Sequence, residues 1–120
     1  RRLKVDGGIF RYSFEAASLG YTLDKDAAKA MLSVFDSSGR QVDAIRLDGV
    51  GRGSHEMTWG NGRAGDSYSF SVSATDGTGG QIPVRTWTSG PATGVSFSSG
   101  RPEVHMNGVT VDMDRIIEIY

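Results

Sequence analysis

Residues 66–75, Asp-Ser-Tyr-Ser-Phe-Ser-Val-Ser-Ala-Thr, alternate apolar and small polar side chains without a break from Ser67 onward. Because successive side chains of a β-strand point to opposite faces, this period of two fits a strand with one buried and one exposed face. The glycine-rich stretches on either side hold the residue types that form turns. The segment therefore predicts a half-buried strand, whose core-facing residues are Tyr68, Phe70, Val72 and Ala74.

Several other segments have the same character and are separated by turns rich in glycine and aspartate. Strands at spacings of about ten residues are typical of a β-sandwich, and residues 10–88 have room for about six or seven of them. Pro83 predicts that the last strand lies at a sheet edge or carries a bulge, since proline cannot donate a ladder hydrogen bond. The strands predicted by alternation, besides 66–75, are 30–36, 40–47, 54–59 and 82–88.

The C-terminal segment predicts a second, smaller unit. Residues 89–94, Ser-Gly-Pro-Ala-Thr-Gly, break the alternation and predict a linker or a crossover. Asn107-Gly108 lies between short apolar alternations, which is a strong signal for a hairpin with a two-residue turn. Asp114 is expected to cap one helical turn that leads into a last short strand at 117–119.

Strands this short are typical of a small barrel, but a segment of roughly thirty residues has too little core to fold alone. We therefore expect the N-terminal residues 3–7 to join it as another strand. The predicted organisation is a discontinuous barrel of residues 1–9 and 89–120, with the sandwich of residues 10–88 inserted in it.

Composition argues against several classes of function. The 120-residue chain has a net charge of −1, so it lacks the positive charge needed to bind nucleic-acid phosphates or anionic lipids. It has no cysteine, which rules out disulfides and thiolate metal sites. No apolar run approaches the roughly 18 residues of a membrane helix. The chain begins at Arg1 without a methionine or a signal-peptide pattern, and we interpret it as part of a longer protein.

The residue types that carry catalysis or bind metals are scattered. His55 and His105 are far apart and fall in no ligand spacing, and no serine lies in a nucleophile-elbow motif. The stretch 76–80, Asp-Gly-Thr-Gly-Gly, lacks the order and the second copy of an aspartic-protease loop. Carboxylate pairs at 24–26 and 112–114 supply too few of the six to eight oxygens that calcium prefers. The sequence predicts no catalytic residues, no metal site and no cofactor.

Trp87 and Arg85 are the strongest candidates for contact with a partner protein. If Ile82 and Val84 face the sandwich core, Trp87 points the other way, on the same face as Arg85. An exposed tryptophan beside an arginine is typical of interface hot spots. In the alternative, Trp87 packs in the crease between sandwich and barrel and fixes the angle between them.

Three stretches resemble the C-terminal region of the bacterial flagellar hook-capping proteins, also called hook assembly scaffold proteins. The first, 32–42, has a strand, an Asp-x-x-Gly turn and a strand; the third, 94–120, has a Gly-Val start, a Val-x-Val strand and a final Asp-x-Ile. The second, 59–84, departs from the family at Gly60, where the family has an acidic residue. In order along this second stretch, the residues that match the family are Trp59, Tyr68, Ala74, Asp76 and Gly79.

The resemblance implies an all-β fold in which a fibronectin type III- or immunoglobulin-like sandwich is inserted into a Tudor-like barrel. It implies a non-enzymatic protein that is exported through the flagellar secretion apparatus and caps the distal end of the growing hook. There, several copies of the protein guide hook subunits into place, and the cap is absent from the finished flagellum. The residues taken to define the fold are Trp59, Tyr68, Phe70, Asp76, Gly79 and Asp114.

A second class of function stays open at this point, a glycan- or adhesin-type binding module of an exported protein. Glycan binding needs a platform of exposed aromatic side chains, for which Trp59 and Trp87 are the best candidates. The assembly scaffold is favoured because the resemblance extends into both predicted units, whereas an adhesin repeat would account only for the sandwich.

Overall fold

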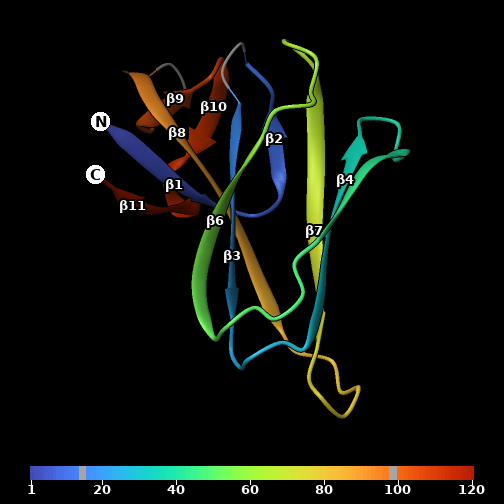
Figure 1. The fold of residues 1–120 in the computed structure, drawn as a ribbon. Coiled ribbons are helices and arrows are strands. Elements are labelled where there is room, and N and C mark those ends of the chain that lie inside the picture. Colours follow the sequence, from blue (N-terminus) through green and yellow to red (C-terminus); the bar gives the residue numbers. More distant parts are fainter. Residues whose placement is uncertain (14–15, 98–99) are drawn as a thin grey trace.

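The computed structural model describes residues 1–13, 16–97 and 100–120. Its regular structure is almost entirely β (Figure 1), which confirms the predicted all-β class. No helix of the described residues is long and apolar enough to cross a membrane. The elements in chain order are β1 (Arg2–Asp6), β2 (Ile9–Arg11), β3 (Ala17–Leu23), β4 (Lys29–Asp36), β5 (Gln41–Arg46), β6 (Gly53–Trp59), β7 (Ser67–Thr75), β8 (Val84–Ser96), β9 (Glu103–Met106), β10 (Val109–Asp112), the 3₁₀ turn η1 (Met113–Arg115) and β11 (Ile116–Ile119).

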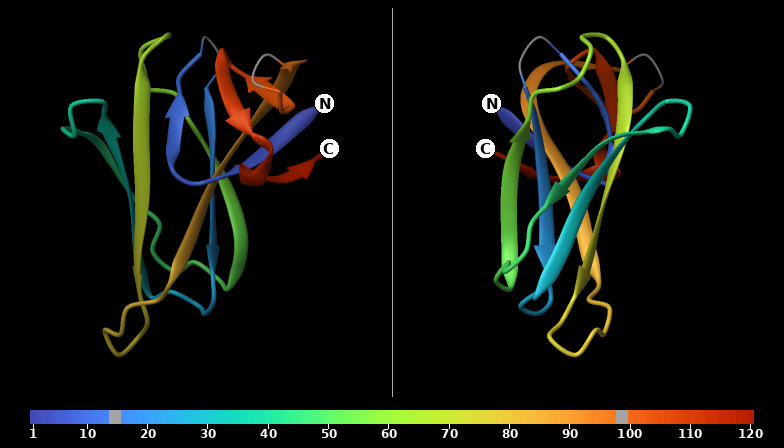
Figure 2. Two further views of the ribbon diagram at one scale, coloured as in Figure 1. Left: turned by 180° about the vertical axis from the view of Figure 1, so that it is seen from behind. Right: turned by 45° about the vertical axis from the view of Figure 1, so that its right-hand side comes forward.

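Two sheets that face each other form the larger part of the molecule, which we call the sandwich (Figure 1, Figure 2). One sheet has the strand order β2-β7-β4-β5, and the other contributes β6, β3 and β8. The alternation of β7 has the predicted effect, because Tyr68, Phe70 and Ala74 are buried while Ser67, Ser71 and Ser73 are exposed. The strands predicted at 30–36, 40–47 and 54–59 are confirmed as β4, β5 and β6.

The sandwich core consists largely of aromatic side chains at one end and of aliphatic side chains at the other. The indole of Trp59 makes edge-on contacts with Phe10, Tyr12 and Tyr68, at ring-centroid distances of 5.9, 5.6 and 5.1 Å. Aromatic rings prefer this geometry because the positive edge of one ring meets the negative face of the other. The cluster at the opposite end consists of Leu23, Ala27, Ala30, Ala74 and Ile82.

β8 is a single strand of 13 residues that runs through the sandwich and continues beyond it. Residues 84–89 pair with β3, residues 87–91 with β1, and residues from 92 to 96 with β9. Residues 89–94 are therefore not a linker, since they are all part of β8, but β8 passes here from the sandwich strand β3 to the strands β1 and β9, as in the crossover alternative. Among the described residues, positions 84–86 of β8 pair only with β3, and β1 pairs with the other edge from Trp87 onward. The part of β8 next to Pro83 therefore lies at a sheet edge, as predicted, and β8 also shifts register between Ala92 and Gly94.

The register explains why β8 tolerates Pro91 in its interior. The hydrogen bond from Ala92 N to Arg1 O shows that Ala92 exchanges backbone bonds with β1, so the backbone groups of Pro91 point to the other edge. On that edge the pairing with β3 has ended at Ser89, and the pairing with β9 begins only at Ala92. The missing N–H of proline therefore costs no ladder hydrogen bond.

The end of the molecule beyond the sandwich, which we call the small lobe, contains β1, the second half of β8, β9, β10 and β11. Its strand order is β10-β9-β8-β1-β11, and it has a core of its own formed by Leu3, Val5, Val104, Met106 and Val111. The expectation that the N-terminal residues join the C-terminal strands is thus confirmed. The two chain ends lie side by side (Figure 1), and Arg2 N donates to Tyr120 O at 2.6 Å.

Two local features of the small lobe can be compared with the sequence. Asn107 and Gly108 form the predicted two-residue turn, with φ angles of 52° and 77° in the left-handed region that such a turn requires. The predicted cap at Asp114 is wrong. Asp112 caps η1, and its side chain accepts a hydrogen bond from Asp114 N at 3.0 Å. Asp114 lies inside the turn and forms an ion pair with Arg101 at 3.6 Å.

Candidate functional site

Trp87 lies on the face of the β3-β8-β1 sheet that points away from the sandwich core. It sits directly opposite Gly20 of β3, and its side chain is only 6% exposed. The ammonium group of Lys4 lies over the indole ring, 3.9 Å from the ring centroid, a cation–π contact. The indole N–H has no hydrogen-bond partner among the residues that the structure describes. Trp87 is thus held between a sandwich strand and a small-lobe strand, as in the crease alternative, and is not an exposed hot spot.

Arg85 lies two residues before Trp87 on the same face of β8. Its side chain is 78% exposed and forms a long ion pair with Asp6, at 3.9 Å. An exposed and weakly paired guanidinium contributes little to stability. Arg85, and not Trp87, is therefore the residue of this pair that a partner could reach directly, and its role in binding stays a prediction.

Trp59 closes the aromatic end of the sandwich and also fixes a carboxylate at the surface. The side chain is 2% exposed, and its indole N–H donates to Asp43 Oδ2 at 2.7 Å. Asn61 donates to the same oxygen at 3.0 Å. These two side-chain hydrogen bonds, Trp59 first, lower the pKa of Asp43, because both favour the ionised carboxylate. The arrangement is structural: it ties β5 to the loop that follows β6.

Tyr68 and Phe70 are both buried in the same aromatic cluster. The phenol oxygen of Tyr68 accepts a hydrogen bond from Arg63 N at 2.8 Å and so anchors the loop between β6 and β7. Gly62 in that loop lies against the ring of Tyr12, where an added Cβ would meet ring carbons at 2.4 to 2.9 Å. Gly62 thus serves close packing, whereas Gly65 supplies a positive φ of 90°.

Asp76 and Gly79 belong to a tight turn between β7 and β8. Asp76 Oδ1 accepts from the backbone of Thr78 at 2.9 Å, from the Thr78 hydroxyl at 2.7 Å and from Gly80 N at 2.9 Å. These bonds, the Thr78 hydroxyl first, lower the pKa of Asp76. Gly79 has a φ of +87°, which L-residues rarely adopt. The turn at Asp36 has the same hydrogen-bond pattern, which explains its repeated Asp-x-Ser/Thr-Gly sequence.

The remaining candidates for chemistry have local partners. His55 shares a hydrogen bond of 2.6 Å with Gly51 O and stacks on Tyr21, while His105 lies 3.3 Å from the hydroxyl of Thr110. Asp26, from the carboxylate pair at 24–26, accepts from Arg52 N at 2.8 Å. Within residues 1–13, 16–97 and 100–120, no group of three or more potential metal ligands comes together.

A cleft of about 240 Å³ lies between the sandwich and the small lobe, and no feature of the sequence indicates it. Three arginines from distant parts of the chain line it: Arg2 on β1, Arg11 on β2 and Arg115 on η1. The rest of the lining is apolar or carries hydroxyl and amide groups, including Ser18, Ser89 and Asn107. No spacing in the sequence could have grouped these arginines, because Arg2 and Arg115 come from paired parts of the small lobe and Arg11 comes from β2 of the other sheet.

Comparisons with known proteins agree on one family. The family model of the FlgD Ig-like domain matches residues 11–78. No curated protein matches the chain in sequence. Among solved structures, the chain is similar to FlgD from Pseudomonas aeruginosa, with a TM-score of 0.77 at 17% identity over 100% of this chain and 96% of that one. FlgD from Xanthomonas campestris gives 0.81 at 17% identity, over 99% and 91%. Since the family model spans more than half of its residues, the chain belongs to the FlgD family of flagellar hook-capping proteins.

Proposed function

We propose that this protein acts in assembly of the bacterial flagellar hook, as a non-enzymatic scaffold that caps the distal end of the growing hook. The proposal is supported above all by the extent of the match. The similarity to FlgD structures covers both the sandwich and the small lobe, whereas the family model alone covers only sandwich residues. The Xanthomonas protein is described as part of the hook capping that is essential for flagellar assembly.

In this role the partners are the hook subunit protein and further copies of the protein itself. The protein is exported through the flagellar secretion apparatus, acts outside the cell at the hook tip and is absent from the finished flagellum. We also propose the division into a discontinuous Tudor-like barrel of residues 1–9 and 89–120 and a fibronectin type III-like sandwich of residues 10–88. The separate hydrophobic cores of the two parts are consistent with that division.

The experiment that tests the role is deletion of the gene, followed by electron microscopy of purified basal bodies. We expect basal bodies without hooks and hook subunits secreted into the medium, with hooks restored when the full-length gene is supplied in trans. Normal hooks and normal swimming in the deletion strain would refute the proposal.

The same strain tests Arg85 as a partner contact. Complementation with Arg85→Glu is compared with Arg40→Glu, because both side chains are about four-fifths exposed and each has one ion pair of 3.9 Å. Neither reversal should unfold the protein, since exposed pairs contribute about 0–1 kcal/mol. If Arg85 contacts a partner, Arg85→Glu shortens or abolishes hooks and Arg40→Glu does not. Equal hook lengths in the two strains would remove Arg85 from the interface.

The glycan- or adhesin-type function loses its best candidates in this structure. The platform it requires would have to come from Trp59 and Trp87, which are 2% and 6% exposed. Neither indole can stack on a sugar ring without leaving its packed position. No observation on the described residues favours this function over hook assembly.

A further inference from the structure

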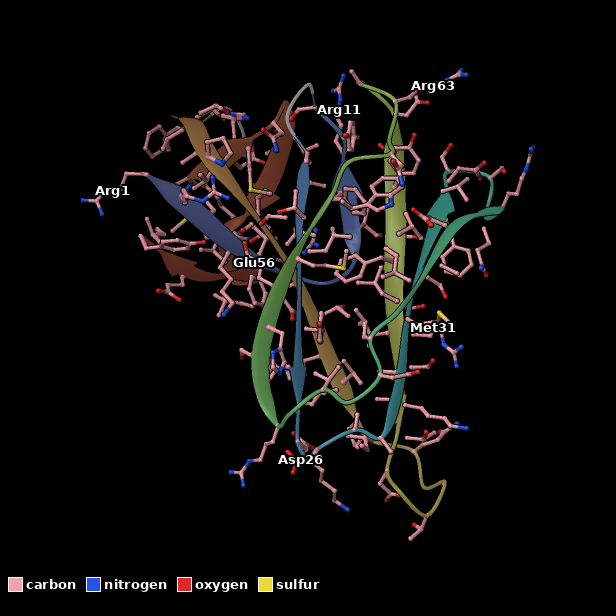
Figure 3. The ribbon with its side chains drawn as sticks, viewed as in Figure 1. Arg1, Arg11, Asp26, Met31, Glu56 and Arg63 are labelled. Carbon is pink, nitrogen blue, oxygen red and sulfur yellow. The ribbon has the colours of Figure 1, made fainter. Side chains whose placement is uncertain are left out.

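The cleft between the sandwich and the small lobe has a wall of unusual charge for a chain with a net charge of −1. Three arginines line it, and no aspartate or glutamate is found among the described lining residues. Glu56 is not one of the lining residues, and its carboxylate accepts hydrogen bonds from the hydroxyls of Ser18 and Ser89, which do line the cleft. Figure 3 labels Arg11 near the top of β2, and Glu56 lower down, on β6.

None of the three guanidinium groups forms an ion pair with a carboxylate of the described residues. Arg2 donates to the hydroxyl of Ser89 at 3.4 Å, and Arg115 donates to the backbone oxygen of Asp6 at 2.8 Å. Arg11 reaches from β2 toward the β9–β10 turn, so that a Cβ added to Gly108 would lie 3.2 Å from its Nη1. Most of the donors of these planar groups are thus left for a ligand.

A second feature of the cleft is the unpaired edge of β2. Phe70 N donates to Gly8 O, and Tyr12 N donates to Asp66 O, so residues 8, 10 and 12 exchange backbone hydrogen bonds with β7. In an antiparallel ladder the intervening residues point their N–H and C=O groups to the other side. These are Ile9 and Arg11, which both line the cleft. β7 is the only strand paired with β2 in the described part of the chain.

We propose that this cleft is a binding site for a short, extended, acidic segment of a protein partner. The segment adds a strand to the free edge of β2, and its backbone bonds the N–H and C=O groups of Ile9 and Arg11. Side chains two residues apart in a strand point to the same face. An alternating acidic segment can therefore present successive carboxylates to Arg2, Arg11 and Arg115, which bind them in the forked geometry that guanidinium and carboxylate share.

The arginine cluster and the unpaired edge of β2 together indicate that the ligand is an acidic peptide segment. A guanidinium cluster alone would accept any anion, but an unpaired strand edge matches only an extended polypeptide backbone. The volume of about 240 Å³ lies below the range of roughly 300–1,000 Å³ for small-molecule pockets. It suits a few side chains of a peptide. The inference goes beyond hook assembly and holds whether or not that role is correct, because its test measures peptide binding to the 120-residue chain directly.

The test uses the blocked peptide acetyl-Thr-Glu-Val-Glu-Val-Glu-Thr-amide as probe, with the same peptide carrying glutamine at each glutamate as control. We expect the acidic peptide to bind at least about tenfold more tightly than the glutamine peptide, since a hydrogen bond between charged groups is worth about 1.5–3 kcal/mol. Arg11→Gln should weaken binding of the acidic peptide about tenfold. Arg46→Gln should leave binding unchanged, because Arg46 lies on β5 and pairs with Asp48 at 3.4 Å.

Amide hydrogen exchange followed by NMR tests the edge independently of the charges. The amides of Ile9 and Arg11 should exchange rapidly in the free chain and become protected when the acidic peptide binds. Equal binding of the two peptides, or equal effects of Arg11→Gln and Arg46→Gln, would overturn the proposal. So would fast exchange of both amides in the complex together with competition by inorganic phosphate, since the site would then bind anions only. Protection of both amides in the free chain would also overturn the proposal, because the edge of β2 would then already be hydrogen-bonded within the protein.

Discussion

The substitution Gly20→Ala tests the packing that joins β3, β8 and β1. Gly20 lies in the middle of β3, directly opposite Trp87. An added Cβ would lie 2.2 Å from two indole carbons and 2.4 Å from a third. Since carbon atoms pack best at about 3.5–4.0 Å, the indole would have to move by more than about 1 Å. Trp87 would then rotate out of its buried position, or β3 and β8 would separate.

The loss of stability can be bounded from these two possible responses to the added Cβ. Forcing extra atoms into a packed site costs about 1–3 kcal/mol when the surroundings yield. Full exposure of the indole sets an upper limit of about 4–6 kcal/mol, from 150–250 Å² of surface at about 25 cal/mol per Å². Two effects oppose this loss: the indole N–H gains water, and alanine is better than glycine inside a strand by about 0.5–1 kcal/mol. We expect Gly20→Ala to reduce the free energy of unfolding by about 2 kcal/mol.

Urea unfolding followed by circular dichroism gives this free energy by linear extrapolation. The matched control is Gly94→Ala, another glycine within a strand, whose added Cβ would lie at an ordinary 3.8 Å from His105. It should change stability by no more than about 0.5 kcal/mol. In a Trp87→Leu background the cost of Gly20→Ala should largely disappear, because the clashing ring is gone. A Gly20→Ala protein as stable as the wild type, or an undiminished cost in the Trp87→Leu background, would refute the reasoning.

Two further predictions concern single residues. Asn107→Ala should lower the free energy of unfolding by about 1 kcal/mol, because alanine tolerates the left-handed φ of 52° less well than asparagine. Asn107→Gly should not lower it. Thermal unfolding of both variants tests this difference. Asp43→Asn should destabilise the protein at pH 7, since the amide accepts less strongly from Trp59 and Asn61 than the carboxylate does. The folded-state pKa of Asp43 is lowered, so its contribution is present above the unfolded pKa of about 3.9 and lost as pH falls through the folded value. Urea midpoints of the wild type and Asp43→Asn should therefore converge between pH 5 and pH 2, and a constant difference would contradict this.

Turns and strands could be predicted from the sequence where their conformation depends on residues that are neighbours in the chain. The alternation in β7 fixes which side chains are buried, because the period of two belongs to the strand itself. Asn107-Gly108 predicts its own turn, since few other residue pairs tolerate the required φ angles. The cap of η1 is Asp112 and not the predicted Asp114, because both residues offer the same side-chain chemistry and only the backbone path distinguishes them.

The course of β8 could not be predicted in this way. Gly90, Pro91 and Gly94 favour a loop when the chain is considered alone, and only the pairing of Gly90 and Pro91 with β1 and of Gly94 with β9 overrides that preference. Gly90 also has a packing reason that the sequence cannot show, because a Cβ there would lie 3.1 Å from the side chains of Met106 and Asn107. The partners come from residues more than eighty positions away in the case of β1.

The sequence by itself determined that the chain is all-β, where most of its strands and turns lie and which family it resembles. These properties depend on side-chain periodicity and on the φ angles that individual residues tolerate, both of which are local. Only the tertiary structure decided that Trp87 is buried under Lys4, that Arg85 is exposed, and that three arginines line one cleft together with β2. These arrangements bring residues 2, 11 and 115 to one cleft and residues 4, 20 and 87 into one cluster, and they exist only once the long-range strand ladders have formed.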